Sequence, residues 1–168
     1  AEIARGHAAG RRLLVATVNL DAQAAVWWNI GAIAASGHPR ALDLARRVLL
    51  ASAAIPGLFP PAMIDVTLDG QAFQEMHVDG GALAQTFLYP SSFGAERRYR
   101  LSRGLPVSAA EAYVIRNARI SGAPAPVGRW TLPIAERALA ALIRANGAGD
   151  LERIHANAER DGIGFNLA

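Results

Sequence analysis

The sequence contains no cysteine, and its basic residues are all arginine. Without cysteine, these 168 residues form no disulfide and hold no metal through thiolate ligands. No apolar run reaches the roughly 18 residues that a membrane-spanning helix needs, because Arg46, Arg47 and Asp65 interrupt the most apolar stretch. The sequence therefore excludes a disulfide-stabilised domain, a cysteine metal centre and a spanning helix within its own length.

Charge is also scarce, at 18% of residues, while apolar residues make up 52%. This composition favours one folded domain with a proper core over extensive disorder. The net charge is +3, but the only basic cluster that includes an aromatic residue is Arg97, Arg98, Arg100 and Arg103 around Tyr99. We interpret this cluster as a solvated loop and predict no nucleic-acid partner. The alternatives are a salt-sensitive nucleic-acid site and attraction to an anionic lipid surface.

The first half of the chain begins with strand signals. The nearly continuous apolar run over 12–18 is typical of a strand buried on both faces, in a sheet covered by helices. A turn is expected at 19–21. Residues 25–30 predict a second strand, with Trp27 and Trp28 on opposite faces. The opening residues, from Ala1 to Arg5, have the character of a helix.

A helix and a hairpin follow. Pro39 is suited to the first turn of a helix, in which Leu42, Ala45, Leu49 and Ser52 share one face with Val48. Pro56 and Gly57 are expected to end that helix. The pair Asp69-Gly70 between two β-prone runs, 63–68 and 71–78, predicts a hairpin. In its second arm Phe73, Glu75 and His77 alternate onto one face, where Glu75 is a possible partner of His77.

In the second half of the chain, the predicted strands and helices alternate less regularly. The sequence predicts a long polar loop over 89–108, with at most a short helical turn, and then a strand at Tyr113–Ile115. An exposed mobile loop is expected at Ser121–Arg129, followed by an amphipathic helix over Leu132–Ile143 that Gly147 closes. A last helix is expected from Asp150 to about Arg160, and a strand begins at Gly162–Phe165. Packing against the sheet is the favoured explanation of the apolar stripe on the Leu132–Ile143 helix, with docking on a membrane as the alternative. The alternation of strands and helices predicts an α/β fold with three layers, in which helices flank a sheet.

The candidate functional residue is Asp79, which follows a predicted strand and precedes Gly80 and Gly81. The two glycines permit a tight turn and allow another backbone or a ligand to approach the carboxylate closely. Most Asp-Gly-Gly tripeptides are ordinary turns. Here the motif follows a stiff, proline-rich corner at 51–61, so the combination is more specific than either part.

The order Ala51-Ser52-x-Ala-Ile55-Pro56-x-x-Phe59-Pro60-Pro61, then a hairpin, then Asp79-Gly80-Gly81, closely resembles the patatin-like phospholipase family. The resemblance extends to the strand and turn over 10–21 and to the strand that begins at Tyr113. It is firm from about 10 to 85 and looser afterwards. It implies that residues 1–168 form a single partial domain, the carboxyl-side portion of a three-layer patatin-like α/β/α fold that is incomplete at its amino-terminal side.

The resemblance also implies a reaction. In that family a serine in a G-x-S-x-G elbow attacks an ester, and an aspartate of the Asp-Gly-Gly motif accepts its proton; Asp79 matches that aspartate, with Gly80 and Gly81 in support. None of the serines here has glycines two positions before and after it, and no Gly-Gly-Gly-x-x-Gly oxyanion motif is present. We therefore expect the intact protein to hydrolyse lipid acyl esters without a cofactor at a membrane surface, and this chain alone to be inactive. The alternative is a non-catalytic module, derived from a hydrolase, that binds lipid or a partner.

Other candidate residues have simpler explanations. Ser52 lies in a predicted helix, where its hydroxyl is expected to bond a backbone carbonyl. The four histidines, at 7, 38, 77 and 155, have no ligand-like spacing, so we predict no metal site. His77 is interpreted as a paired, structural histidine, although a position beside Asp79 is the alternative.

Overall fold

The structure is a computed structural model that describes residues 1–117, 122 and 124–168. The chain divides into two compact units, Ala1–Ala84 and Gln85–Ala168, and each is considered by itself. The prediction of a single partial domain is not tested by this division. Among the described residues, none of the helices combines the length and the apolar character that crossing a bilayer demands.

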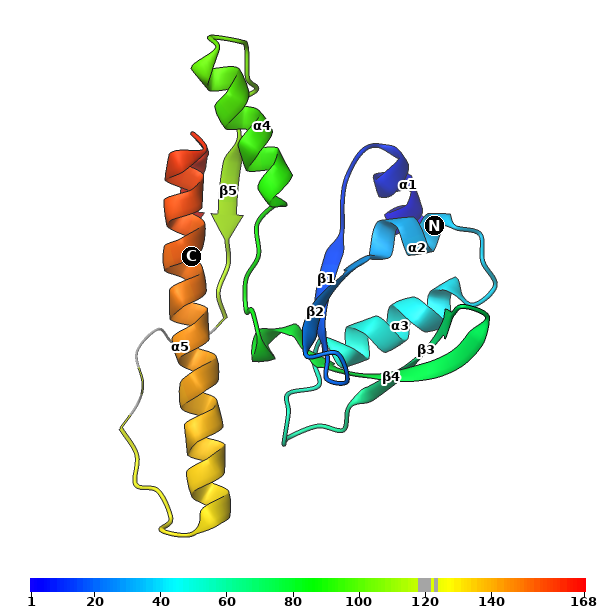
Figure 1. Ribbon diagram of the computed structural model, residues 1–168, viewed down its shortest axis with the longest axis vertical. Helices are drawn as coiled ribbons and strands as arrows, with labels where there is room; N and C mark the ends of the chain where they lie inside the picture. Colours follow the sequence, from blue (N-terminus) through cyan, green and yellow to red (C-terminus); the bar gives the residue numbers. More distant parts are fainter. Residues whose placement is uncertain (118–121, 123) are drawn as a thin grey trace. The chain divides into compact units, whose positions relative to one another are not determined.

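The first unit contains a four-stranded antiparallel sheet with the order β2-β1-β4-β3 (Figure 1). Its elements are α1 (Glu2–Ala8), β1 (Leu14–Asn19), β2 (Ala24–Asn29), α2 (Ile30–Ala35), α3 (Ala41–Ala51), β3 (Ala62–Leu68), β4 (Gln71–Asp79) and the short 3₁₀ helix η1 (Gly80–Ala82). The opening helix, both early strands and the helix after Pro39 are confirmed. Helix α2 was not predicted.

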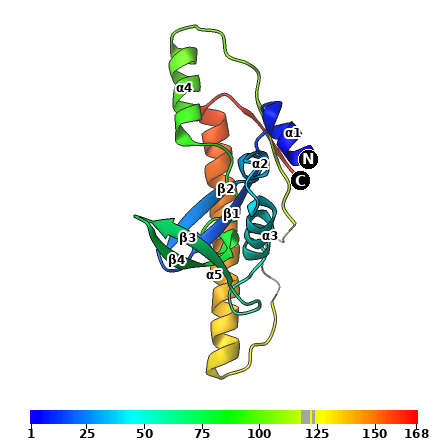
Figure 2. The ribbon, with the colours of Figure 1, turned by 90° about the vertical axis from the view of Figure 1, so that its right-hand side faces the viewer.

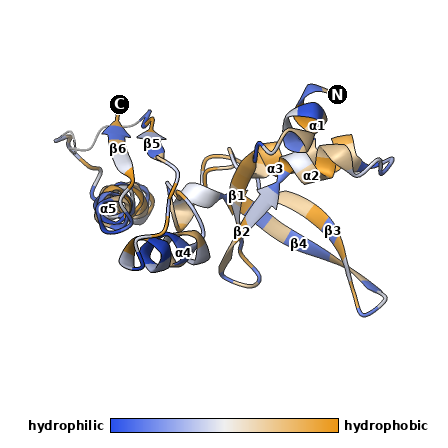
Figure 3. Ribbon diagram, turned by 90° about the horizontal axis from the view of Figure 1, so that it is seen from above, coloured by the Kyte–Doolittle hydropathy of each residue, from blue (hydrophilic) through white to orange (hydrophobic). Residues whose placement is uncertain are grey.

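The helices of this unit lie on one side of the sheet (Figures 2 and 3). Ile30 of α2, Val48 of α3 and Ile64 of β3 form the buried core between the layers. Trp28 packs against this core, whereas Trp27 is 54% exposed, which confirms that the two tryptophans point to opposite faces of β2. Hydrophobic residues predominate in α2, β1 and β3, which are largely orange in Figure 3.

The face that α3 buries agrees only in part with the predicted one: Ala45 and Val48 face the core as expected. Leu42 and Leu49 were expected to point inward, but they are 62% and 52% exposed. The buried positions are Val48 and Ala51, with Leu44 packed beside them. The spacing of the apolar residues was correct for a helix, but α3 carries leucines around more than one face, so spacing alone did not fix its orientation.

The predicted hairpin is confirmed. Met63 to Leu68 pairs with Gln71 to Met76 in the expected register, and the two central turn residues, Asp69 and Gly70, have φ values of 51° and 78°. Positive φ at both positions is the requirement of a type I′ turn, whose twist matches that of the flanking strands.

The mixed α and β fold is likewise confirmed, but the sheet differs from the expected one. The apolar run at β1 was predicted to be buried on both faces; in the structure Leu14 at its start is 38% exposed, whereas Thr17 and Val18, which point to opposite faces, are 0% and 3% exposed, so only the second half of the strand is buried on both faces. All pairings in this sheet are antiparallel, an arrangement in which one face can remain uncovered. Within the described residues of this unit, helices cover a single face, so the three-layer arrangement stays a prediction.

The second unit is built around one long helix. Its elements are α4 (Ser91–Ser102), β5 (Glu111–Val114), α5 (Thr131–Arg160) and β6 (Gly164–Leu167), and β5 pairs with β6 in parallel. The strands expected near Tyr113 and Phe165 are confirmed, as are the inward positions of Leu151, Ile154 and Ala158. Of the predicted loop at 121–129, residues 121 and 123 lie outside the described residues, and residues 124–129 have no helix or strand.

Two predictions for this unit are wrong. The polar stretch expected to be a loop contains the 12-residue helix α4. The two helices expected on either side of Gly147 are one continuous helix, α5. Gly147 is buried where a β-carbon would lie 2.0 Å from Gln85 Oε1, so this glycine serves close packing. Asp150 caps no helix; its Oδ2 accepts the backbone N–H of Gln85 at 2.7 Å.

A buried carboxylate connects α4 with the end of α5. Asp161 is fully buried and accepts hydrogen bonds from Tyr89 Oη at 2.7 Å, from Arg160 Nε at 3.1 Å and from Arg98 Nη1. The hydrogen bond from Arg160, reinforced by those from Tyr89 and Arg98, holds the pKa of Asp161 well below its usual range. Burial, together with the adjacent Asp161 carboxylate, raises the pKa of Tyr89 to about 12.

The arginine cluster is part of this structure, and its interpretation as a solvated loop is wrong. Arg97 is 7% exposed and donates to the carbonyl oxygens of Ser108, Asp161 and Gly162 at 2.7 to 3.0 Å. Arg98 pairs with Asp161. The hydrogen bonds of Arg97 and Arg98 thus hold α4 against the end of α5. Buried carbonyl groups need donors, and Arg97 provides them.

Candidate functional site

Asp79 is the last residue of β4, and it lies beside the proline-rich corner that follows α3. Its backbone N–H donates to Ala54 O at 3.0 Å. On the other side, Asp79 is the register partner of Thr17 in β1. The structure therefore brings together the corner and the Asp-Gly-Gly motif, which are separated by a hairpin in the sequence.

The two glycines after Asp79 have distinct roles. The backbone N–H of Gly81 donates to Asp79 Oδ1 at 2.8 Å, which fixes the orientation of the carboxylate. No second hydrogen bond to this carboxylate is found among the described residues. Gly80 lies against β1, where an added β-carbon would be 2.7 Å from Ala16 O.

Gly80→Ala is expected to lower the free energy of unfolding by roughly 1 to 3 kcal/mol, because the new methyl group would meet a backbone carbonyl that has little freedom to move. Urea unfolding followed by circular dichroism measures the effect. The control is Gly149→Ala in α5, where no atom lies within 4 Å of the added methyl group and alanine is the better helix former. Equal stability of the Gly80 variant and the wild type would contradict the close approach.

The surroundings of Asp79 are apolar but partly open. The side chain itself is half-buried, and its neighbour Val78 is 2% exposed. In the adjoining corner, Leu58 and Phe59 are 67% and 57% exposed. Leu83, which follows the Asp-Gly-Gly motif, is 48% exposed.

A chain of buried polar groups runs next to Asp79 on the same strand face. Trp28 Nε1 donates to Thr17 Oγ1 at 2.8 Å, and this hydroxyl lies 2.9 Å from His77 Nδ1. His77 Nε2 lies 3.0 Å from Glu75 Oε2. Thr17 and His77 are both fully buried. The pairing of Glu75 with His77 is confirmed, whereas the roles of Thr17 and Trp28 were not predicted.

The Glu75 carboxylate is only an acceptor, so a neutral His77 has its hydrogen on Nε2, directed at Glu75, and its Nδ1 is an acceptor. The Thr17 hydroxyl, which accepts from the indole N–H of Trp28, then donates its own hydrogen to His77 Nδ1. This assignment rests on the network and not on observed hydrogens. Because Thr17 has no exposed surface, its hydroxyl is structural here and is no nucleophile for an external substrate.

Ser52 has the structural role that was expected. Its Oγ donates to Leu49 O at 3.0 Å, and the residue caps the C-terminal end of α3. Among the described residues, no group of three or more histidine, aspartate or glutamate side chains is arranged to hold a metal ion.

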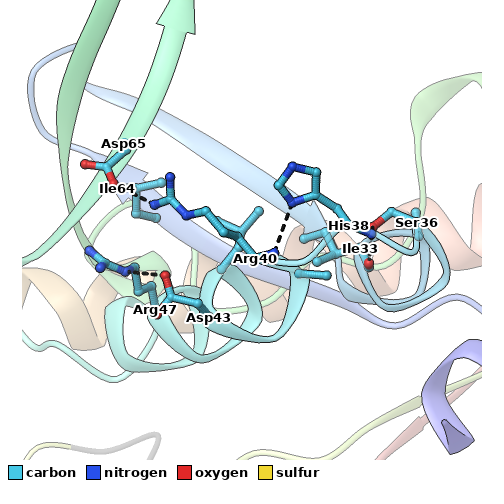
Figure 4. A pocket seen from close by; sticks show the side chains of 11 residues that line it. Ile33, Ser36, His38, Arg40, Asp43, Arg47, Ile64 and Asp65 are labelled. Carbon is cyan, nitrogen blue, oxygen red and sulfur yellow. Dashed lines mark hydrogen bonds and ion pairs between the residues drawn. The ribbon is translucent and has the colours of Figure 1, made fainter.

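A separate groove of about 460 Å³ lies between α2, α3 and β3 (Figure 4). Asp79 is not among the residues that line it. Its charged side chains are paired with one another: Arg40 with Asp65 at 2.8 Å and Arg47 with Asp43 at 3.1 Å. Hydrogen bonds from Gln74 and then Arg40 lower the pKa of Asp65. The two ion pairs thus match the charged side chains of the groove with one another.

Comparison of the chain with protein-family models, with curated proteins and with solved structures found no match.

Proposed function

We propose that this chain supplies the general base, Asp79, of a serine–aspartate dyad that hydrolyses acyl esters of lipids. The observation that carries the proposal is the placement of Asp79 at a strand end, with Oδ1 held by the Gly81 N–H. The hydrogen bond from Asp79 N to Ala54 O supports it, because it joins the two motifs on which the patatin-like resemblance rests.

In this reaction a serine hydroxyl adds to the ester carbonyl while its proton passes to Asp79 Oδ2. The tetrahedral intermediate collapses to an acyl-serine, and the proton leaves with the alcohol. Water then attacks the acyl-serine and gives a proton to the same carboxylate; as the second tetrahedral intermediate collapses, that proton returns to the serine oxygen and the acid is released. A carboxylate is a weak base, so it serves only when it is held within hydrogen-bond reach of the hydroxyl. The contact with Gly81 provides that fixed orientation.

The proposal places the nucleophile outside these 168 residues, since none of their serines lies in a G-x-S-x-G sequence. It also includes a three-layer fold for the intact domain. In that fold a second helical layer would cover the sheet face that carries Leu14, Met63 and Met76, opposite the face packed by α3.

Asp79→Asn is expected to abolish turnover of a short-chain nitrophenyl ester by the longer protein that contains the serine, because an amide accepts no proton from the hydroxyl. The matched control is Asp69→Asn in the exposed hairpin turn, which should leave turnover unchanged. Near-wild-type turnover in the Asp79 variant, with the fold intact by circular dichroism, would remove Asp79 from the mechanism.

A non-catalytic module is the second candidate, and the missing serine motif favours it for this chain. A fluorophosphonate probe separates the two candidates in the longer protein. Covalent labelling of one serine supports the hydrolase, whereas unlabelled protein that still binds acyl chains supports the binding module. The 168-residue chain alone is expected to be unlabelled in both cases.

A further inference from the structure

The two halves of α5 have different environments. The C-terminal half packs against β5 and β6 through Leu151, Ile154 and Ala158, which are at most 8% exposed. The N-terminal half, from Thr131 to Ala140, is exposed at every position except one. In Figure 1 this yellow half extends past β5 and α4 of its own unit. The apolar stripe was predicted to pack on a sheet; within its own unit, this half does not pack on β5 and β6.

Four apolar side chains of the projecting half form one stripe, whereas Ile134, which is 53% exposed, lies outside it on the side of Arg137. Leu132, Ala135, Leu139 and Leu142 recur at intervals of three and four residues, which places them in one stripe along the helix. Leu132 and Leu142 are 67% and 62% exposed, and Leu139 is 36% exposed. Such a stripe is costly to leave in water, and a contiguous exposed apolar surface commonly marks an interaction site.

The flanks and the opposite face of this half are basic. Between residues 129 and 144 the sequence has three arginines and one glutamate, a net charge of +2. Arg137 and Arg144 lie on the helix face opposite Leu132 and Leu139. Trp130 immediately precedes the helix and is 66% exposed. Leucines on one face, arginines on the other and an exposed tryptophan at the end are typical of helices that lie in a membrane interface.

A second copy of the chain is a weaker explanation. The stripe from Leu132 to Leu142 is about 16 Å long at 1.5 Å per residue. A helix face of that length falls well short of the roughly 800 Å² per partner that a stable protein interface buries. Two copies would also bring like charges together, whereas an anionic surface attracts each arginine.

We propose that the projecting half of α5 is a docking surface for an anionic lipid bilayer, with its leucine stripe in the interface and its arginines near the headgroups. The proposal does not rest on acyl hydrolysis, because Asp79 belongs to the other unit and takes no part in it.

The test uses the 168-residue chain and sedimentation with two kinds of vesicle. One contains phosphatidylcholine alone, and the other contains equal parts of phosphatidylcholine and phosphatidylglycerol. Binding is expected to the anionic vesicles and to weaken as salt is added. Leu139→Glu should weaken it at least about tenfold, because it puts a charge into the apolar stripe. Trp130 is expected to report the contact as a blue shift that is lost in Trp130→Phe.

Ala140→Glu is the matched control, since it makes the same change in charge one residue along, outside the stripe, on an exposed position. It should cost much less affinity than Leu139→Glu, while circular dichroism shows both variants to be as helical as the wild type. Three results would overturn the proposal: no binding of the wild type, equal losses in the two variants, or a lipid-independent dimer that Leu139→Glu dissociates. The last result would identify a second copy as the occupant.

Discussion

Asp161→Ala is expected to lower the free energy of unfolding of the second unit by about 3 to 5 kcal/mol. The carboxylate is fully buried and is the shared acceptor of Tyr89, Arg98 and Arg160. Its removal leaves a tyrosine hydroxyl without its carboxylate and two arginines without their counter-charge. Both arginine side chains are partly exposed, at 39% and 56%, so water relieves part of the loss and the lower end of the range is favoured.

Urea unfolding of the wild type and of two variants measures this effect. Asp43→Ala removes a carboxylate that forms an exposed pair with Arg47 in α3, and it should cost less than about 1 kcal/mol. If Asp161→Ala were as mild as Asp43→Ala, the buried network would not be what holds α4 to the end of α5.

The pH dependence provides a second measurement. The pKa of Asp161 is lowered in the folded protein, chiefly by the hydrogen bond from Arg160, so the unfolded chain binds a proton more readily. The stabilisation is therefore complete above the ordinary aspartate pKa of about 3.9, and it is lost as the pH falls below that value. Wild-type stability should decline more steeply on acidification below about pH 5 than the stability of Asp161→Asn.

The parts of the fold that follow from neighbouring residues were predictable. The Asp69-Gly70 turn demands positive φ at two positions, and few residue pairs other than Asp-Gly and Asn-Gly tolerate it. The register of β3 and β4 follows directly from that turn. Asp79 lies beyond that register, because the β3–β4 pairing ends at His77 and Asp79 pairs with Thr17 of β1.

The wrong predictions concern residue types that occur in two different structural roles. Gly147 was expected to end a helix, because glycine is common just past a C-terminus. In the structure it lies in mid-helix, where Gln85 leaves no room for a side chain. Asp150 was expected to cap a helix but accepts a backbone N–H from another segment. Both roles depend on a partner more than 60 residues away, which local patterns do not reveal.

The prediction of a solvated loop at α4 was wrong because arginine, too, occurs in two structural roles. A run of arginines is usually solvated, and the surrounding polar residues strengthened that expectation. Arg97 instead satisfies three carbonyl groups near the end of α5 and the approach to β5. Its long apolar stem is readily buried when the guanidinium finds acceptors.

The polar chain beside Asp79 was missed because its members are distant in sequence. Thr17 lies within an apolar run, and Trp28 resembles a core residue, so neither attracts notice alone. The available signal was a threonine inside an otherwise aliphatic strand, which requires a buried partner for its hydroxyl. The antiparallel pairing of β1 with both β2 and β4 brings Trp28 and His77 to that hydroxyl.

Thr17→Val is expected to lower the free energy of unfolding by roughly 2 to 4 kcal/mol, although the two side chains have almost the same shape. Valine neither accepts from Trp28 Nε1 nor donates to His77 Nδ1, so two polar groups in the interior lose a partner at once. Thr17→Ser retains both hydrogen bonds and loses one methyl group, so it should recover most of the stability.

The control that isolates the hydroxyl is Thr67→Val, the same substitution at an exposed position of β3 in the same sheet. It should change stability by no more than about 0.5 kcal/mol. Nitrogen-15 NMR of His77 gives an independent readout, because the network puts the hydrogen on Nε2 and leaves Nδ1 as an acceptor. If Nδ1 carries the hydrogen, or if the two valine variants are equally stable, then Thr17 is not the donor that orients His77, and the strand end bearing Asp79 is held by some other contact.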